Sequence, residues 1–358
     1  MLPPSPAVGM RQWRVTRLDS CATPVLEVVV CPHDGLEAPR ERKVSMRIET
    51  GRLFTPTAPT APTALAASLL VLAFTGACSR GTITVPPVTP QPTGVHEVGK
   101  FVWYDLLTSE PDSVRRFYSE LFGWQFESGE AGSERYTVIT RKGTPIAGVV
   151  QMDRGEVSKA RWLSYLSVAD VDSAVDYVRD TGGLVHAEPG ELPNRGRYAV
   201  VSDPQGAVLA FLRSSGGDPL GRDTPDYPFE PGDWLWTELW THDIDAAREF
   251  YESLAGYDYQ TIDFGDGNDY YVMKNGEQLY SGILELPWPE VEPNWLPYVV
   301  VEDLEMTIRR TEALGGRVLV APQTEEERQM AIIADPSGAV LNVQEWHPEL
   351  AKRRLDDK

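Results

Sequence analysis

Two acidic residues stand among tryptophans on predicted β-strands, and these are the positions at which chemistry is expected. Because side chains alternate along a strand, each acidic residue shares one face with neighbouring tryptophans. The two sets are Trp103 with Asp105, and Trp234, Trp236, Glu238 and Trp240; Tyr165 and Tyr298 lie on the equivalent faces of two later strands. An aromatic surface with one carboxylate is the usual composition of a small-molecule site.

Asp105 or Glu238 in such surroundings could have a raised pKa and serve as a base. The alternative is that the rings only fill a hydrophobic core. The sequence leaves both interpretations open.

The strands that carry these residues belong to a segment that occurs twice. The stretch 103–108 leads to Phe117-Tyr118, and the stretch 236–241 leads to Phe250-Tyr251, 133 positions later. Each copy closes on Asp-Pro-x-Gly-Ala-Val-Leu, at 203–209 and 335–341. A register held over this distance predicts two copies of one domain.

A finer period lies within each copy. A strand over 103–108 precedes a helix whose apolar stripe includes Val114, Phe117 and Tyr118, and further strands follow. The strand over 163–168 begins the same order again. The folded part is therefore predicted to be four βαβββ units, paired into two modules.

These units resemble the vicinal oxygen chelate superfamily, which includes glyoxalase I, the bleomycin resistance proteins and the extradiol dioxygenases. The resemblance rests on the Phe-Tyr helices, the strands around Gly148 and Gly282 and the Asp-Pro-x-Gly closing strands, and it covers about 99–347. It implies an α+β fold in which each pair of units forms one mixed, cup-shaped sheet. In catalytic members it also implies a divalent metal at the base of the cup, held by His, Gln and Glu.

The positions that the resemblance assigns to metal ligands hold few donor side chains here. The first strands of the units place Trp103, Leu163, Trp236 and Leu296 there, and the closing strands place Ala210 and Asn342. Gln151 and Glu285 end strands nearby, and Glu238 is two residues from an expected position. The resemblance thus implies degenerate sites without a resident cofactor, in which Glu238 and Glu285 are the remaining metal candidates.

Other chemistry has little support. The chain has 5 histidines, at positions where structural or solvated roles are expected, and it has no Ser/His/Asp or Cys/His signature and no Gly-rich phosphate loop. A net charge of −20 argues against a nucleic-acid partner, because phosphate binding requires a basic face. The sequence does not determine the oligomeric state.

The N-terminal region predicts export and lipidation. The apolar run 64–77 has the length of a signal-peptide core, and Phe74 to Cys78 resembles a bacterial lipobox, in which the cysteine is lipidated. An uncleaved signal anchor is the alternative. Met46 and the arginines that follow supply a basic start, so the preceding residues are interpreted as a gene-model extension.

The predicted organisation has seven parts. They are an unstructured extension over 1–45, a lipoprotein signal peptide over 46–77, a Pro/Thr-rich tether without a core over 78–98, module 1 over 99–215, a linker over 216–231, module 2 over 232–348 and a charged tail over 349–358. Each module holds a complete set of strands and helices, so we expect the two to fold largely independently.

Two functions from different classes are compatible with these features. The first is a metal-free module, anchored to the cell envelope by lipid, that binds a small aromatic or hydrophobic molecule. The second is a divalent-metal-dependent lyase, isomerase or dioxygenase of the glyoxalase type, using module 2. The first is preferred; catalytic residues are not identified, and the pocket candidates are Trp103, Asp105, Gln151, Tyr165, Trp236, Glu238, Trp240, Glu285, Tyr298 and Asn342.

Cys78 is predicted to be the lipid-modified first residue of the mature protein. Mass spectrometry of the membrane fraction should find no peptide from residues 46–77 in the mature chain. Cys78→Ser should abolish processing and membrane association; unchanged processing in this variant would contradict the prediction.

Overall fold

The computed structural model describes residues 26–28, 44–46, 85–128, 135–153, 159–220, 228–263, 269–322 and 330–346. Before residue 85, the described part is an antiparallel ladder of two short strands, β1 (Leu26–Val28) and β2 (Val44–Met46). Cys78, the apolar run before it and the charged tail lie outside the described residues. Within these ranges, no helix is long and apolar enough to cross a membrane.

Module 1 forms one sheet of 8 strands in the order β4-β5-β6-β3-β7-β10-β9-β8. Its first unit is β3 (Phe101–Thr108), α2 (Pro111–Phe122), β4 (Gln125–Ser128), β5 (Tyr136–Arg141) and β6 (Thr144–Gln151). Its second unit is β7 (Arg161–Ser167), α3 (Val171–Asp180), β8 (Leu184–Leu192), β9 (Gly196–Ser202) and β10 (Val208–Ser214). The antiparallel pair β3–β7 joins the two units at the centre of the sheet.

Module 2 repeats this order as β12-β13-β14-β11-β15-β18-β17-β16. Its first unit is β11 (Trp234–Thr241), α4 (Ile244–Ala255), β12 (Asp258–Asp263), β13 (Asp269–Asn275) and β14 (Gln278–Glu285). Its second unit is β15 (Asn294–Val301), α5 (Leu304–Ala313), β16 (Arg317–Val320), β17 (Met330–Ala334) and β18 (Val340–Glu345). The prediction of four βαβββ units in two modules with mixed sheets is confirmed.

Local sequence explains where the helices begin and end. Asp243 caps the N-terminus of helix α4, where its carboxylate accepts a hydrogen bond from the backbone N–H of Ala246 at 2.9 Å. Pro111 occupies the first turn of α2, where no backbone donor is needed. Gly123 and Gly256 end α2 and α4 at φ values of 71° and 70°, a left-handed conformation that favours glycine.

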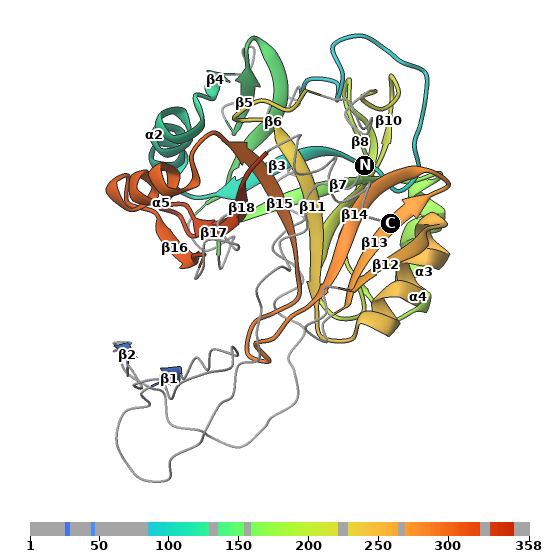
Figure 1. Cartoon of the computed structure of the whole chain (residues 1–358). Coiled ribbons are helices and arrows are strands. Elements are labelled where there is room, and N and C mark those ends of the chain that lie inside the picture. Colours follow the sequence, from blue (N-terminus) through green and yellow to red (C-terminus); the bar gives the residue numbers. More distant parts are fainter. Residues whose placement is uncertain are drawn as a thin grey trace.

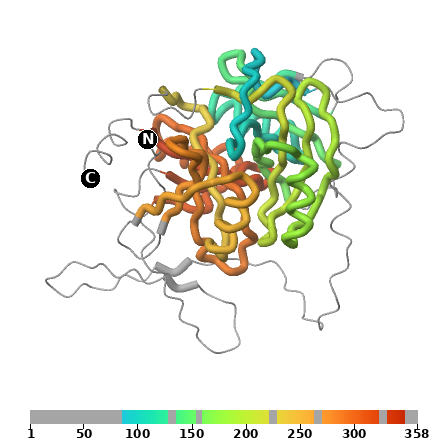
Figure 2. Tube along the Cα trace, turned by 90° about the vertical axis from the view of Figure 1, so that its right-hand side faces the viewer, coloured from blue at the N-terminus to red at the C-terminus, as the bar shows by residue number. Residues whose placement is uncertain are grey.

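One face of each sheet packs against the other module, and the opposite face packs only against residues of its own chain half. The helical faces pack across the module boundary, so that α2 lies beside α5 and α3 beside α4 (Figure 1). One apolar cluster joins Leu106 and Phe117 of module 1 with Val299 and Ile333 of module 2, and a second cluster joins the other two units. Figure 2 shows the modules side by side. The expectation of independent cores therefore fails, because separation would expose both clusters to water.

We call the opposite faces cup 1 and cup 2. The cluster of cup 1 includes Trp103, Tyr136, Leu163, Tyr165 and Ala210, and that of cup 2 includes Trp236, Trp240, Tyr270, Leu296 and Tyr298.

Trp234 was expected to share the face of Trp236, but it packs in the cluster between the modules. A shift of register between Trp234 and Trp236 in the pairing of β11 with β15 reverses the side-chain alternation there.

The repeated motifs meet across the module boundary. The Tyr118 hydroxyl of α2 donates to Asp335 of the second Asp-Pro-x-Gly turn at 2.9 Å, and the Tyr251 hydroxyl of α4 donates to Asp203 of the first at 2.9 Å. Burial raises the pKa of Asp203 and of Asp335, and the hydrogen bonds oppose this shift. Each tyrosine also accepts a tryptophan N–H at 3.0 Å, from Trp162 or from Trp295.

We call residues 85–98 the strap; they are the described part of the predicted tether. Val85 and Val88 are 1% and 6% exposed and belong to the cluster of cup 1. The backbone N–H groups of Thr93 and Gly94 donate to the carbonyl of Gly216 at 2.8 and 3.0 Å. This region was predicted to have no core; its two valines instead bury apolar surface against module 1.

Tyr118→Phe and Tyr251→Phe should each lower the free energy of unfolding by about 1–3 kcal/mol, because each leaves a buried carboxylate without one of its donors. Urea unfolding monitored by circular dichroism measures this. Tyr259→Phe is the matched control, because its hydroxyl bonds the Arg248 carbonyl within module 2. Equal effects of all three changes would contradict an inter-module role.

Candidate functional site

Glu238 is the centre of cup 2. It lies on β11, is fully buried and accepts hydrogen bonds from three aromatic side chains. Its Oε1 accepts from the Tyr270 hydroxyl at 2.7 Å, and its Oε2 accepts from the Tyr298 hydroxyl and from Trp240 Nε1 at 3.3 Å. Trp236 Nε1 donates in turn to the Tyr270 hydroxyl at 2.9 Å. The predicted group Trp236, Glu238, Trp240 and Tyr298 is thus brought together around one carboxylate.

A glycine on the neighbouring strand makes room for this arrangement. Gly282 of β14 pairs with Glu238, and a Cβ at Gly282 would lie 2.0 Å from the Tyr270 hydroxyl oxygen. Only a residue without a side chain lets this hydroxyl reach the carboxylate. The glycine of the repeated strand motif is therefore required for the hydrogen bond between Tyr270 and Glu238.

The protonation of Glu238 is set by burial. Desolvation raises the pKa of Glu238 to about 7, although the three hydrogen bonds oppose the shift. Among the described residues no cationic side chain contributes to this shift. Glu238 therefore changes its charge near neutral pH, where it can act as an acceptor, a donor or a base.

Asn342 adds a second polar group to cup 2. It lies on β18 beside Tyr298 of β15, and its amide lies against the Tyr298 hydroxyl, although neither amide atom meets hydrogen-bond geometry within the described part of the chain. Both atoms are buried. Buried polar atoms are usually hydrogen-bonded in folded proteins, so this amide is suited to bind a polar group that enters the cup. Elsewhere in cup 2, the ring of Trp240 stacks with that of Trp288 at 6.2 Å between centroids.

Cup 1 has the same plan around Asp105. Oδ1 accepts from Trp103 Nε1 and from the Tyr136 hydroxyl, and Oδ2 accepts from the Tyr165 hydroxyl, each at 2.8 Å. Gly148 on the neighbouring strand again makes the room, since a Cβ there would lie 2.1 Å from the Tyr136 hydroxyl oxygen. The predicted group Trp103, Asp105 and Tyr165 is brought together as well.

An arginine distinguishes cup 1 from cup 2. The guanidinium of Arg195 is fully buried, with Nη1 3.6 Å from Asp105 Oδ2 and Cζ 4.0 Å from the centroid of the Trp103 ring. Gly196, at φ 120°, allows the turn that directs Arg195 inward, because a Cβ there would lie 2.2 Å from the Arg213 carbonyl oxygen. Arg195 therefore balances the charge of Asp105.

Two predicted site residues lie outside the cups. Gln151 and Glu285 end β6 and β14, and both side chains are exposed. Their neighbours Val150 and Leu284 belong to the cup clusters. Alternation along the strand turns Gln151 and Glu285 to the opposite face, so neither joins the buried carboxylate of its module.

Three residues of the cups were missed by the sequence analysis: Tyr136, Tyr270 and Arg195. The two tyrosines occupy equivalent repeat positions, 134 apart as are Gly148 and Gly282, and this shared offset was the available signal. Arg195 lies in a turn, and no sequence pattern placed it inside a cup.

Among the described residues, no group of three or more His, Cys, Asp or Glu side chains is arranged to hold a metal ion.

Comparison with known proteins agrees with this architecture. Residues 100–211 and 235–343 match the Glyoxalase/Bleomycin resistance protein/Dioxygenase superfamily. The chain belongs to this superfamily. The matched ranges correspond to the two modules, so the predicted resemblance is confirmed.

Two relatives are similar to this chain over almost their whole length. CFP32 of Mycobacterium bovis, provisionally named a glyoxylase, is 30% identical over 254 residues, which are 69% of this chain and 95% of that protein. The anthracycline biosynthesis protein DnrV of Streptomyces peucetius is 30% identical over 272 residues, which are 71% of this chain and 96% of that protein.

The chain is also similar to two solved structures. The Mn(II)-bound glyoxalase from Novosphingobium aromaticivorans is 14% identical, with 70% of this chain and 83% of that one covered and a TM-score of 0.46. A variant of homoprotocatechuate 2,3-dioxygenase from B. fuscum is 14% identical, with 74% of each chain covered and a TM-score of 0.48.

Stability should depend on pH through Glu238. Its pKa is raised on folding from an ordinary value of 4.5 to about 7, so the folded state holds the proton more tightly. Binding of this proton adds roughly 3 kcal/mol to the free energy of unfolding. This contribution is fully present below about pH 4.5 and is lost as the pH rises to about 7. Relative to Glu238→Gln, which stays neutral, the wild-type chain should lose stability over this range. Parallel pH profiles in urea unfolding would contradict the assignment.

Proposed function

We propose that cup 2 binds a small aromatic or hydrophobic molecule carrying a polar atom that Glu238 and Asn342 recognise. The observation that carries this proposal is the pair itself: a buried carboxyl group whose pKa is about 7 and a buried amide, which both lie against the Tyr298 hydroxyl. A carboxyl group and an amide can each donate or accept, so together they suit a carbonyl or hydroxyl group.

The surroundings of this pair favour an aromatic ligand. Trp236, Trp240 and Leu296 are among the apolar side chains of cup 2, and Trp236 is 9% exposed. Flat rings on tryptophan gain from stacking beyond the area they bury. The family relatives include an anthracycline biosynthesis protein and a protein provisionally named a glyoxylase, which supports a small organic molecule as the ligand.

The donor set of neither cup fits a divalent metal ion. In cup 1 the carboxylate of Asp105 is paired with Arg195, and Ala210 and Leu163 offer no ligand atoms. In cup 2 Glu238 is surrounded by tyrosine and tryptophan donors, which compete for the same oxygens. The alternative is a metal-dependent lyase, isomerase or dioxygenase. Its metal site would need Glu285 as a second carboxylate ligand, but Glu285 lies outside the cup. We therefore include degenerate metal sites in the proposal.

Attachment to the cell envelope completes the proposed role. The lipobox-like sequence ending at Cys78 would hold the two modules at a membrane surface through an N-terminal lipid. The strap begins 7 residues after Cys78 and packs against module 1, which would keep the cups close to that surface.

Trp236→Ala should weaken ligand binding by about 1–3 kcal/mol, because it deletes a stacking surface in cup 2. A thermal-shift screen with small aromatic carbonyl and hydroxyl compounds identifies a ligand, and calorimetric titration then measures its affinity. Trp103→Ala, at the equivalent position of cup 1, is the matched control and should leave that affinity unchanged. Equal losses in both variants would contradict binding in cup 2.

Binding should also be independent of metal. Treatment with a chelator should leave the affinity of the identified ligand unchanged. Stoichiometric Zn, Ni, Mn or Fe in the purified protein, lost on Glu238→Ala, would overturn the metal-free proposal and favour the enzyme.

A further inference from the structure

We infer that cup 1 is a binding site for an extended proline-containing peptide, and that the strap is its resident, displaceable ligand. The strap binds through the apolar sequence Val85-Pro86-Pro87-Val88 and through one backbone carbonyl. This inference concerns module 1 and does not depend on what cup 2 binds.

The apolar contact comes from two valines. Val85 and Val88 are buried, whereas Pro87 between them is exposed. The segment belongs to no strand or helix, so its position in the cup rests on side-chain contacts and on the carbonyl described next. Recognition of an extended proline segment by an aromatic-lined surface is a recurrent binding mode, because proline reduces the entropy lost on binding.

Arg195 supplies the polar contact. Its Nε and Nη2 donate to the carbonyl oxygen of Pro86 at 3.1 and 3.0 Å. Module 1 itself holds the guanidinium in place through the Trp103 ring, through Asp105 and through the Tyr136 hydroxyl, which lies 3.1 Å from Nη2. The strap thus provides an acceptor for a charged group that module 1 positions.

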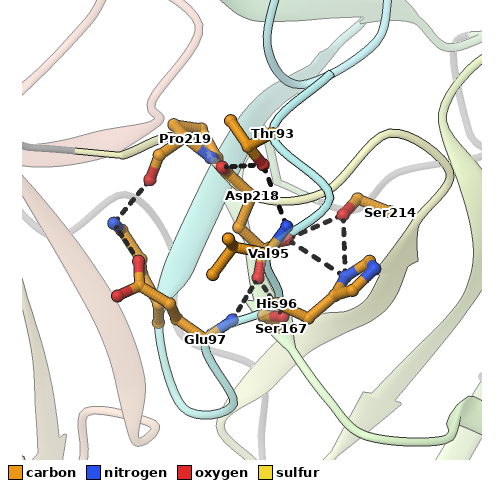
Figure 3. Close-up of polar contacts among 9 residues, drawn as sticks. Thr93, Val95, His96, Glu97, Ser167, Ser214, Asp218 and Pro219 are labelled. Atoms are coloured by element: carbon orange, nitrogen blue, oxygen red, sulfur yellow. Dashed lines mark hydrogen bonds and ion pairs between the residues drawn. The ribbon is translucent and has the colours of Figure 1, made fainter.

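A separate latch holds the other end of the strap at the rim of module 1 (Figure 3). Asp218 is buried, and it accepts from the backbone N–H of Glu97 at 2.8 Å and from the hydroxyls of Ser167 and Ser214 at 2.6 and 2.7 Å. The Thr93 hydroxyl donates to the Asp218 carbonyl at 2.9 Å. Residues 90–92, between the latch and the cup, are exposed. Residues 85–88 can therefore leave the cup without breaking the latch.

The experiment uses the full chain carrying Val85→Asp and Val88→Asp. Two carboxylates are costly to bury in an apolar cup, so the strap of this variant should leave it. A fluorescent peptide with the wild-type sequence of residues 84–92 should then bind in trans, one peptide per chain, in an anisotropy titration. The unsubstituted chain should not bind the peptide below about millimolar concentration, because the covalently linked strap competes with it.

Two matched controls test the named contacts. A peptide with Val88→Asp should bind the variant chain at least about tenfold more weakly, because one buried valine is lost. Adding Arg195→Lys to the variant chain keeps a cation opposite Asp105 but removes the paired donors, and it should also weaken binding of the wild-type peptide. Circular dichroism and thermal unfolding establish that each chain is folded.

Three outcomes would overturn the inference. Failure of the double variant to unfold cooperatively would show that the strap is an integral part of the core. A folded double variant that does not bind the peptide would show that the latch alone positions the strap. Equal affinity of the wild-type and Val88→Asp peptides would show that cup 1 does not recognise the valine.

Discussion

A buried carboxyl group at the centre of each cup is the constraint on which the rest of the site depends. Asp105 and Glu238 lie on the first strands of their modules and have almost no contact with water. An ionised carboxylate in such a position is costly unless hydrogen bonds or an opposite charge compensate it. Each module meets this need with two tyrosine hydroxyls and a tryptophan N–H. The glycine opposite each carboxylate is required because one tyrosine approaches through the space of its missing side chain.

The two modules solve the remaining charge problem differently. Module 1 adds Arg195, and this guanidinium takes its acceptor from the carbonyl of Pro86 in the strap. In module 2 the carboxyl group instead has its pKa raised toward neutrality, and Asn342 lies beside Tyr298, whose hydroxyl donates to that carboxyl group. In cup 1 the carboxylate is paired with an arginine and the strap occupies the cup, whereas in cup 2 the carboxyl group titrates near neutral pH. Fold alone does not set the chemistry of a site, and here two copies in one chain differ in it.

The opposite faces of the sheets explain why the repeat is so regular. The tyrosine of each Phe-Tyr helix bonds the aspartate of the Asp-Pro-x-Gly turn in the other module. The motifs that identify the superfamily in this chain therefore hold the modules together, while most cup residues come from other positions of the repeat. Because the motifs serve pairing, they carry little information about what the cups bind.

The sequence by itself determined the repeat, the four βαβββ units and the aromatic faces of the first strands. These follow from local periodicity and from a register kept over 133 positions. It also placed Trp103, Asp105, Trp236 and Glu238 correctly, because strand alternation depends only on neighbouring residues.

Alternation failed where a strand is irregular or where the register is uncertain by one residue. A register shift moved Trp234 to the module interface, and Gln151 and Glu285 proved to face away from the cups. Only the tertiary structure decided that Tyr136 and Tyr270 reach the carboxyl groups, that Arg195 enters cup 1 and that the strap fills it. These contacts join residues from separate strands, turns and the N-terminal segment. Their geometry is set by packing between elements, which no local pattern in the chain records.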